Sequence, residues 1–381
     1  MQTADFLVVG AGVAGLSAAA RLAGHGRVIL FEAEEAIGYH SSGRSATFSH
    51  YGIGNRLVRS LTAYSRGFFL DPREPLLARR STALFVATEQ MVPALERLRA
   101  DMAGFTESLL DPSPTELAEA FPPLRIGANG IVAAILYPDG LRLDSDALLQ
   151  FYAKRIRDQG GLVRTGARMT QIRSSGSLWT VETESGSWSA PILINAAGAW
   201  ADDVARSAGV SPLDLRPLRR TIIVVGPPPG ADVRNWPFVK TVVDDFYILP
   251  ESGQLMASPV DEIESDPCDA QPEEYDVALA AAKVEQYTHL KVNRIAHRWA
   301  GLRTFARDRV PVAGFAPDSP GFFWLAGQGG FGLQTAPAMA EAVEAIITGA
   351  AWPPGLSNFG VEAADLQPQR LSKQSSSAGE T

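Results

Sequence analysis

Short apolar runs and longer amphipathic runs alternate along much of the chain, and this pattern predicts an α/β fold. Residues 5–10 (DFLVVG) and 27–32 (RVILFE) are typical of buried parallel strands, and the Ala- and Leu-rich segment 13–26 between them predicts a helix. Residues 192–198 (ILINAAG) and 321–327 (GFFWLAG) repeat the apolar pattern later in the chain. We therefore expect buried strands at four distant places in the sequence.

The segments between these runs mix strands with helices. Strands are predicted at 81–87, 131–137, 220–226, 246–250 and 253–260, and helices at 90–104, 113–121, within 139–161 and at 274–288. A chain of 381 residues exceeds what one hydrophobic core usually serves, so we expect two domains. Residues 367–381 are polar and contain no core-building residues, which predicts a disordered tail.

Charge and composition narrow the partners. The formal net charge of −8 argues against nucleic acid, because phosphate binding needs a basic surface. Cys268 is the one cysteine and the five histidines lack metal-ligand spacing, so we predict no metal. We expect no transmembrane segment, because no apolar run reaches ~18 residues. Residues 1–15 have no basic leader, so we expect a cytoplasmic protein and leave peripheral attachment to the inner membrane face open.

A glycine motif follows the first predicted strand. Gly10, Gly12 and Gly15 fit G-x-G-x-x-G, and Glu32 ends the second strand 20 residues beyond Gly12. The glycines allow a tight turn, close approach of a pyrophosphate and close packing of helix on strand, while the acid accepts hydrogen bonds from a ribose. We therefore predict a dinucleotide site. Glu32 would repel a 2′-phosphate, so NADP is disfavoured and FAD and NAD remain.

Two further segments extend this site. The loop 39–52 (YHSSGRSATFSHYG) leaves the second strand at the carboxyl edge of the sheet, where ligands of such sheets lie. Its residues 41–45 suit contacts to phosphate and ring, and its later residues are expected nearer the substrate. Residues 325–347 run from a strand through the glycine-rich loop GQGGFG into a helix, whose N-terminus would stabilise negative charge on a reduced flavin. A nicotinamide has no matching need.

These pieces, in this order, resemble the D-amino-acid oxidase superfamily of FAD enzymes, which includes glycine and sarcosine oxidases. The resemblance covers residues 5–347 and is carried by VVGAGVAGLSAAARLA, Glu32, GYHSSGRSA, LINAAGAWADDVA, WAGLRTF and GQGGFGLQTAPAM. Within the superfamily, HSSGRSA, WAGLR and QGGFGLQT look most like the bacterial D-amino-acid dehydrogenases of the D-arginine dehydrogenase type.

The resemblance implies a fold and a reaction. It implies a Rossmann-type FAD-binding domain assembled from discontinuous segments, which we assign to 1–50, 140–210 and 296–366, and an α+β substrate domain with a mostly antiparallel sheet, which we assign to 51–139 and 211–295. The implied reaction moves the substrate Cα hydride to flavin N5, and the imino acid then hydrolyses to a 2-oxo acid and ammonia. Cys268 lies outside the flavin-facing segments, so we expect non-covalent FAD.

The glycine motif and the family's segments together give the expected FAD contacts. They are Gly10, Gly12, Val13, Ala14, Gly15, Glu32, Ala33, Ser41, Ser42, Gly43, Arg44, Ser45, Ala46, Met169, Ala196, Gly198, Trp200, Gly301, Arg303, Gly329, Gly330, Gly332, Leu333, Gln334 and Thr335.

The substrate carboxylate needs a cation. Arg303 is the candidate, because a guanidinium matches a carboxylate at two points and the family places its carboxylate-binding arginine in this motif. Tyr247 matches the family's strand tyrosine that hydrogen-bonds the same carboxylate, and Arg220 is a second candidate cation. Gln334 and the backbone at Gly330 are expected near the flavin ring and the substrate amine.

The loop 39–52 supplies a candidate base. His50 is the candidate, because an unperturbed imidazole titrates near neutral pH; the alternative is a loop histidine bound to backbone, with water taking the ammonium proton. Tyr51 and His40 are weaker candidates for contacts in the same region, between cofactor and substrate.

The sequence departs from its closest resemblance at the pocket. Relatives acting on cationic D-amino acids have an acid and a tyrosine where we align Thr82 and Ile53, and a histidine where this chain has Phe48. Lys240 lies on a strand expected to border the pocket. Losing an acid and gaining a cation disfavours a cationic substrate, so we expect an apolar or acidic side chain, unless Lys240 extends to solvent.

Other functions of the same fold stay open. A 2-hydroxy acid or an N-alkyl amino acid shares the carboxylate and the Cα hydride, so Arg303 and Tyr247 would serve equally. The chain would otherwise be a flavin-binding subunit that needs a partner. A nicotinamide dehydrogenase leaves the C-terminal glycine–helix unit without a ligand. The electron acceptor (quinone, electron carrier or oxygen) and the oligomeric state are not encoded in any motif.

Overall fold

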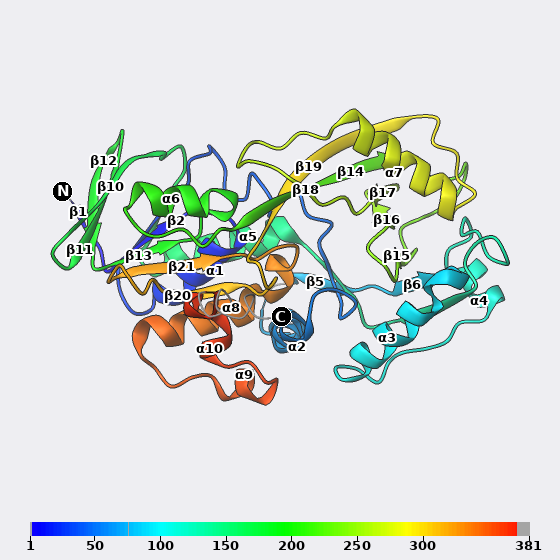
Figure 1. Cartoon of the computed structure of the whole chain (residues 1–381), viewed down its shortest axis with the longest axis horizontal. Helices are drawn as coiled ribbons and strands as arrows, with labels where there is room; N and C mark the ends of the chain where they lie inside the picture. The colour runs from blue at the N-terminus through cyan, green and yellow to red at the C-terminus, as the bar shows by residue number, and fades with distance from the viewer. Residues whose placement is uncertain (1, 75, 372–381) are drawn as a thin grey trace, which may run out of the picture.

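The computed structural model describes residues 2–74 and 76–371, and within these ranges the strands form four sheets. Figure 1 shows an elongated molecule. A small sheet lies at one end, helices α3 and α4 lie at the other, and the long strands β14 and β19 run between them.

The first large sheet has the order β20-β21-β13-β2-β3-β9. Its strands β2 (Phe6–Val9), β3 (Val28–Phe31), β9 (Leu162–Arg164), β13 (Ile192–Asn195) and β21 (Phe322–Ala326) are parallel, and β20 (Val312–Phe315) is antiparallel to β21. Along β2, Phe6 and Val8 join one core cluster while Leu7 and Val9 join another. Both faces are therefore covered, which explains why these strands are apolar throughout.

Helices cover one face of this sheet, and a smaller sheet covers the other. Helix α1 (Val13–Leu22) packs between α5 (Ser145–Asp158) and α8 (Gly332–Thr348), with α2 (Arg56–Phe69) against α8. On the other face lie the strands β1 (Gln2–Thr3), β12 (Gly186–Ala190), β11 (Leu178–Thr183) and β10 (Met169–Ser175), with η2 (Gly198–Trp200) and α6 (Ala201–Ser207). The arrangement is the predicted Rossmann-type unit, assembled from distant segments.

The second large sheet has the order β18-β14-β17-β16-β15-β6-β7, with β19 paired to β14. Its strands are β18 (Ile263–Glu264), β14 (Arg216–Val225), β17 (Gln254–Ser258), β16 (Tyr247–Glu251), β15 (Phe238–Thr241), β6 (Ala83–Ala87), β7 (Ala133–Tyr137) and β19 (Ile295–Phe305). The pairings are antiparallel except for β15 with β6, as expected for a mostly antiparallel sheet.

The side chains of this sheet alternate between two environments. Leu84, Val239 and Ile248 pack toward α7 (Glu274–Tyr287) and α4 (Pro114–Ala120), whereas Phe85 and Tyr247 face the opposite side, part of which is covered by α3 (Val92–Ala103). The uncovered remainder of that second face is the wall of the site described below.

Shorter elements join these layers. Strands β4 (Phe48–Ser49), β8 (Leu141–Leu143) and β5 (Ala78–Arg80) form a three-stranded sheet, and η1 (Glu89–Met91) precedes α3. Helices α9 (Pro354–Asn358) and α10 (Ala363–Leu366) follow α8. No described helix is long and apolar enough to cross a membrane.

Three boundaries differ from the sequence prediction. Helix α2, within the residues 51–139 that we assigned to the substrate domain, packs against α8 in the core beside the first sheet. Strand β19 pairs with β14 along its length, so residues 296–305, which we assigned to the FAD-binding segments, belong to the second large sheet. Residues 367–371, which we assigned to the tail, include the 3-10 helix η3 (Pro368–Leu371) with Pro368 and Leu371 buried. Leu371 packs into the core beside the first sheet, which orders this stretch. The rest of the predicted tail, 372–381, lies outside the described residues.

Candidate active site

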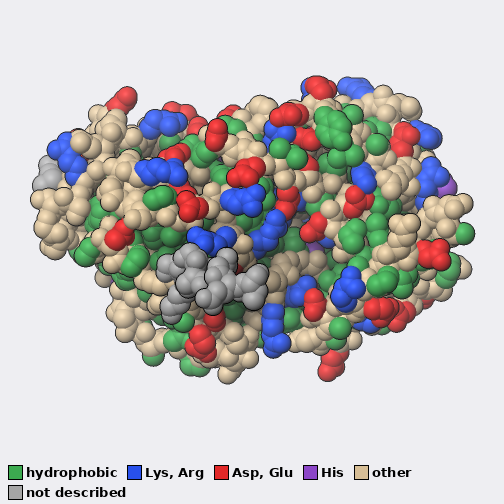
Figure 2. All heavy atoms as spheres, in the orientation of Figure 1, with side chains coloured by type: hydrophobic (Ala, Val, Ile, Leu, Met, Phe, Trp, Pro, Cys, Tyr) green, Lys and Arg blue, Asp and Glu red, His purple; other side chains and the backbone are tan. Residues whose placement is uncertain are grey.

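A cavity of about 900 Å³ runs from the glycine turn after β2 to the uncovered face of the second large sheet. Figure 2 shows basic side chains gathered along the middle of the viewed face, where the surface is hollowed between the two ends of the molecule. Because one cavity joins both sheets, a ligand bound at the first can reach groups carried by the second.

The cofactor end of the cavity begins at the glycine turn. Gly10 has φ +99°, and a Cβ there would lie 2.5 Å from the carbonyl oxygen of Ala196, the residue that follows β13. A Cβ on Gly15 would lie 2.0 Å from the carbonyl oxygen of Gly10, whereas one on Gly12 would meet only the Ser42 hydroxyl at 3.3 Å. Gly10 and Gly15 therefore serve the turn and its packing, while Gly12 keeps the backbone open toward the cavity.

Glu32 and Ser42 organise this end through backbone bonds. The Glu32 carboxylate accepts hydrogen bonds from the backbone N–H groups of Ala11, at 2.8 Å, and Glu34, at 3.0 Å. Ser42 Oγ accepts from the N–H of Val13, at 3.0 Å, at the start of α1. A carboxylate has further lone pairs beyond these two bonds, so Glu32 keeps capacity for ribose hydroxyls.

The loop 39–52 is hydrogen-bonded to β19 and to the segment at Asp269 and Ala270. Arg44 donates to the carbonyl oxygens of Ala270 and Ala300, both at 3.1 Å, and pairs with Asp269. Trp299 Nε1 donates to the carbonyl oxygen of Arg44, at 3.1 Å, and the Ser41 hydroxyl donates to that of Leu302. These bonds join the loop to the second large sheet, and because Ser42 also bonds the start of α1, the loop connects the two walls of the cavity.

Helix α8 presents its N-terminus at the same cavity. The glycine-rich loop before it includes Gly327 and Gly329, both with positive φ, and Gly332 and Leu333 of the first turn line the cavity. Nearby, Gln328 Nε2 and Thr304 Oγ1 are buried and have no hydrogen-bond partner within the described residues. Open N–H groups and unpaired polar atoms fit the polar edge of a flavin ring.

The second sheet places the substrate candidates side by side. Lys240 on β15 is directly opposite Tyr247 on β16, and Leu218 on β14 is opposite Arg303 on β19. Arg220 lies two residues along β14 from Leu218, so it shares that face. Arg220, Tyr247, Lys240 and Arg303 all line the cavity.

The guanidinium of Arg303 is a cavity-lining cation that lacks a hydrogen-bonded partner in the described chain. It is largely buried, it lies against Gly330, and its nearest carboxylate oxygen is Glu262 Oε1 at 3.6 Å. It has no hydrogen-bond acceptor among residues 2–74 and 76–371. Burial, followed by the positive charge of Arg220, lowers the pKa of Arg303 to about 9, so the group stays charged at neutral pH.

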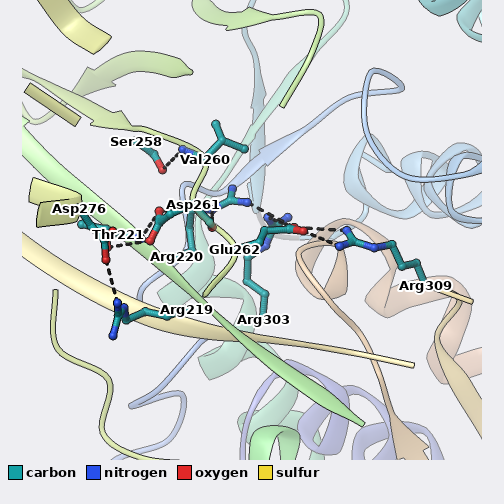
Figure 3. A network of polar contacts seen from close by, with 10 residues as sticks. All are labelled: Arg219, Arg220, Thr221, Ser258, Val260, Asp261, Glu262, Asp276, Arg303 and Arg309. Atoms are coloured by element: carbon teal, nitrogen blue, oxygen red, sulfur yellow. Dashed lines mark hydrogen bonds and ion pairs between the residues drawn. The ribbon is translucent and has the colours of Figure 1, made fainter. Parts of the chain in front are cut away.

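Glu262 is a charged neighbour of Arg303 that the sequence did not indicate. Its Oε1 contacts Arg220 at 3.5 Å and Arg303 at 3.6 Å, and Arg309 donates to both of its carboxylate oxygens (Figure 3). Arg220 is further anchored by its Nε–H, which donates to the carbonyl oxygen of Asp261 at 2.7 Å. Val260 and Arg309, on either side of this cluster, both have φ +57°, an unusual conformation for these residue types.

His50 is held in one tautomer. Its Nδ1 accepts from the N–H of Gly52, at 3.0 Å, so the ring proton is on Nε2, which has no partner in the described chain. The pKa of His50 is lowered to about 3, mainly by burial and secondly by the positive charge of Lys240. A neutral imidazole with Nε2–H is a hydrogen-bond donor, and this environment disfavours the role of base that the sequence suggested.

Most predicted site residues line the cavity, and a few lie behind it. Gln334 accepts from the N–H of His50, at 3.3 Å, and donates to Thr62, at 2.8 Å, so it positions His50 from the core. Tyr51 packs against Phe105 and Tyr137. The predicted residues outside the lining are Gly15, Gly43, Tyr51, Gln334 and Thr335.

The remaining predictions for the site are placed as follows. Phe48 and Ile53 line the cavity, Phe48 stacked on Phe238 with ring centroids 4.7 Å apart. His40 also lines it, bound to Glu34 and packed against Trp200 at the cofactor end. Residues that sequence reasoning missed include Ile222, Phe238, Asp244, Val260, Glu262, Phe305 and Arg309.

No described group of three or more His, Cys, Asp or Glu side chains could hold a metal ion. Cys268 is exposed and is not among the lining residues.

Comparison with known proteins identifies the group that fits this cavity. The sequence model of the family described as "FAD dependent oxidoreductase" matches residues 5–346. Among curated proteins, glycine oxidase of Geobacillus kaustophilus is 24% identical over 358 residues, which cover 87% of this chain and 90% of that protein. Mitochondrial dimethylglycine dehydrogenase of Mus musculus is 26% identical over 272 residues, and the match spans 67% of this chain but only 30% of that longer protein.

Solved structures confirm the fold. L-α-glycerophosphate oxidase of Mycoplasma pneumoniae with FAD bound has a TM-score of 0.82 and 20% identity, covering 91% of this chain and 95% of that one. L-proline dehydrogenase from P. horikoshii has a TM-score of 0.80 and 20% identity, covering 98% of each chain.

Proposed function

This chain belongs to the family of FAD-dependent oxidoreductases, with FAD as its cofactor, and from that premise we propose that it catalyses oxidative deamination of a D-amino acid. The substrate would be oxidised to the imino acid, bound FAD would supply the acceptor for the electron pair, and water would convert the imino acid to a 2-oxo acid and ammonia. The exposed position of Cys268 outside the cavity is consistent with non-covalent FAD.

One observation carries the proposal. The Arg303 guanidinium is largely buried, faces a cavity shared with the cofactor residues, and has no hydrogen-bond acceptor in the described chain. A buried cation without hydrogen-bonded partners is costly, so the site is built to receive an anion that is not part of the protein. A substrate carboxylate is such an anion, and a guanidinium binds it at two points.

Tyr247 and His50 have separate roles around that carboxylate. The Tyr247 hydroxyl has no partner in the described chain and is available to the same carboxylate. FAD, when bound, supplies the two-electron acceptor. His50 stays neutral and donates from Nε2, so the proton of the substrate ammonium passes to water rather than to His50.

The finer identity of the substrate rests on two arguments. The D-configuration and the D-arginine dehydrogenase type are proposed from the resemblance of residues 40–46, 299–303 and 328–335. Phe48, Phe238 and Lys240 border the cavity, which supports an apolar or acidic side chain over a cationic one. The acceptor that reoxidises FAD stays open among a quinone, an electron carrier and oxygen.

A second candidate is oxidation of an N-alkyl amino acid or a 2-hydroxy acid. It is favoured by the relatives, since glycine oxidase and dimethylglycine dehydrogenase are named for substrates without a D-configured side chain. Arg303 and Tyr247 would bind the carboxylate of either class.

Product analysis separates the candidates. Holoenzyme supplied with an artificial electron acceptor is given D- and L-amino acids, N-methyl amino acids and 2-hydroxy acids, and 2-oxo acid and ammonia are measured. The proposal expects equal amounts of 2-oxo acid and ammonia from D-amino acids alone. A 2-oxo acid formed from hydroxy acids without ammonia, or an amine released from N-methyl substrates, would replace it with the second candidate.

A further inference from the structure

Lys240 is a buried cation in the wall of the cavity. The residue is 4% exposed, so its side chain does not extend to solvent. Its ammonium donates to the carbonyl oxygen of Thr241, at 3.1 Å, and pairs with Asp244 Oδ1, at 2.9 Å. An ammonium has three donors, and the third has no acceptor in the described chain. Burial lowers the pKa of Lys240, and its pairing with Asp244 opposes that shift.

The β-sheet register puts Lys240 next to the predicted carboxylate site. Lys240 is opposite Tyr247 across β15 and β16, and side chains directly opposite on paired strands have Cβ atoms about 4.5–5.5 Å apart. Phe238, two residues along β15, shares the same face, and its ring lies 4.7 Å from that of Phe48. An apolar strip therefore adjoins Lys240 within reach of a ligand held by Tyr247.

His50 adds a second donor beside Lys240. Its ring centroid lies 5.3 Å from that of Phe238, and the charge of Lys240 is second only to burial in lowering its pKa. The Nε2–H of His50 has no acceptor in the described chain. An ammonium with one free donor and a neutral imidazole N–H without an acceptor suit a carboxylate better than an apolar group.

The net charge of the residues at the substrate end of the cavity also favours a second carboxylate on the ligand. Four cations face three carboxylates there, because Arg220 also pairs with Asp261, and the lining Asp308 is engaged by Arg370. The cations are Arg220, Lys240, Arg303 and Arg309, and the carboxylates are Asp244, Asp261 and Glu262. An amino acid with one carboxylate has no net charge and leaves the excess positive charge uncompensated, whereas an amino acid with two carboxylates carries a net charge of −1 and neutralises it.

We propose that the substrate is a dicarboxylate, an amino acid of the aspartate or glutamate type or its N-substituted counterpart, with one carboxylate on Arg303 and Tyr247 and the other on Lys240 and His50. This inference rests on the proposed function, since it names the substrate class of the same site. Asp244 is a competitor for Lys240. Its side chain is 68% exposed on the turn after β15, and the incoming carboxylate takes its place.

Binding of unreactive acids tests the inference without turnover. FAD-loaded protein is titrated with glutarate and with pentanoate, which have equal carbon number, and binding is followed by the change in the flavin spectrum and in the melting temperature. Since hydrogen bonds to charged groups contribute about 1.5–3 kcal/mol, wild-type protein should bind glutarate about 10-fold or more tightly than pentanoate. Lys240→Met should abolish that preference and leave pentanoate affinity unchanged.

Two further variants complete the experiment. Asp244→Asn should strengthen glutarate binding, because it removes the competing carboxylate, and it tests the idea even if Lys240→Met fails to fold. Lys154→Met, on the exposed side of α5, should behave as wild type. Equal affinity for the two acids in wild type, or equal loss of both in Lys240→Met, would overturn the inference.

The outcome is separable from that of the proposed function. If glutarate binds through Lys240 but no D-amino acid is deaminated, the dicarboxylate site stands and the reaction is wrong. If D-amino acids are deaminated and glutarate shows no preference, the reaction stands and the dicarboxylate site is wrong.

Discussion

At Gly330 the lack of a side chain decides where Arg303 can lie. A Cβ on Gly330 would lie 1.5 Å from Nη2 of Arg303 and 2.2 Å from its Cζ, so the guanidinium occupies the space a side chain would need. Gly330→Ala should displace Arg303 and weaken carboxylate binding about 10- to 100-fold, the range expected for losing hydrogen bonds to a charged group. The measurement is ligand affinity from flavin spectral titration.

The matched control is a glycine with free space around it. Gly67→Ala adds a methyl group inside α2 where nothing lies within 4 Å, and alanine favours helix over glycine by roughly 1 kcal/mol. We expect unchanged ligand affinity and equal or higher stability. Equal ligand affinity in both variants would show that Arg303 does not bind the carboxylate.

The lowered pKa of His50 predicts how the free energy of unfolding changes in acid. The folded protein keeps it neutral down to about pH 3, whereas the unfolded chain takes up the proton near 6.5. The unfolded state therefore binds more protons between these values, and the free energy of unfolding falls as the pH is lowered through this window. His50→Gln should make the decline between pH 7 and pH 5 shallower, as measured by urea unfolding.

The control for this measurement is an exposed histidine. His289→Gln should keep the wild-type slope, because His289 lies on the surface. Parallel slopes for wild type and His50→Gln would contradict the assignment of His50 as a buried neutral group.

Among the elements, the turn from β2 into α1 separates two uses of glycine. A Cβ on Gly15 would collide with backbone at 2.0 Å, so Gly15→Ala should destabilise the fold itself. A Cβ on Gly12 would meet only the Ser42 hydroxyl at 3.3 Å, so Gly12→Ala should fold as apoprotein but lose FAD, because the methyl group blocks the approach of the pyrophosphate.

The measurement for this pair is FAD content per folded chain, with circular dichroism of the apoprotein as the test of folding. Wild-type FAD content in Gly12→Ala would remove the turn from the cofactor site. A folded, stable Gly15→Ala would contradict the packing account.

Sequence patterns predicted the elements whose signal is local. The strands around Gly10 and the helix after it were predictable because apolar runs, glycines and an acid follow one another at fixed spacing. Helix α2 was not predicted, although Asn55 caps it by accepting a hydrogen bond from the N–H of Val58. Strand β19 was not assigned to the second sheet, because its partner β14 lies about 80 residues earlier.

The site residues also divide into those marked by local motifs and those brought together only by the fold. Arg303 and Tyr247 could be named because they belong to motifs that resemble a family. Glu262, Asp244 and Arg309 could not, because no motif contains them. Glu262 and Arg309 come together with Arg303 only when two loops meet β19, and Asp244 lies in the turn four residues after Lys240. The burial that makes His50 neutral comes from Phe85 and Phe238, which are also distant in sequence.

In the whole molecule, most of the predicted cofactor residues lie beside the first sheet, and the predicted charged substrate residues lie on the second. The loop 39–52 joins them, because Arg44 and Ser41 bind the backbone around β19 while Ser42 binds the start of α1. We propose that the nucleotide end holds the redox cofactor and that side chains on one face of the second sheet select the substrate carboxylate.

The measurement that tests this account most directly is an anaerobic spectral titration. Purified holoenzyme is mixed without oxygen with D-amino acids, L-amino acids, N-methyl amino acids and 2-hydroxy acids in turn, and the absorbance of oxidised flavin at roughly 450 nm is followed. The account predicts a yellow protein that is bleached by D-amino acids, and a large loss of that bleaching rate at low substrate in Arg303→Lys. A protein that binds no FAD, or an Arg303→Lys variant bleached as efficiently as wild type, would contradict it.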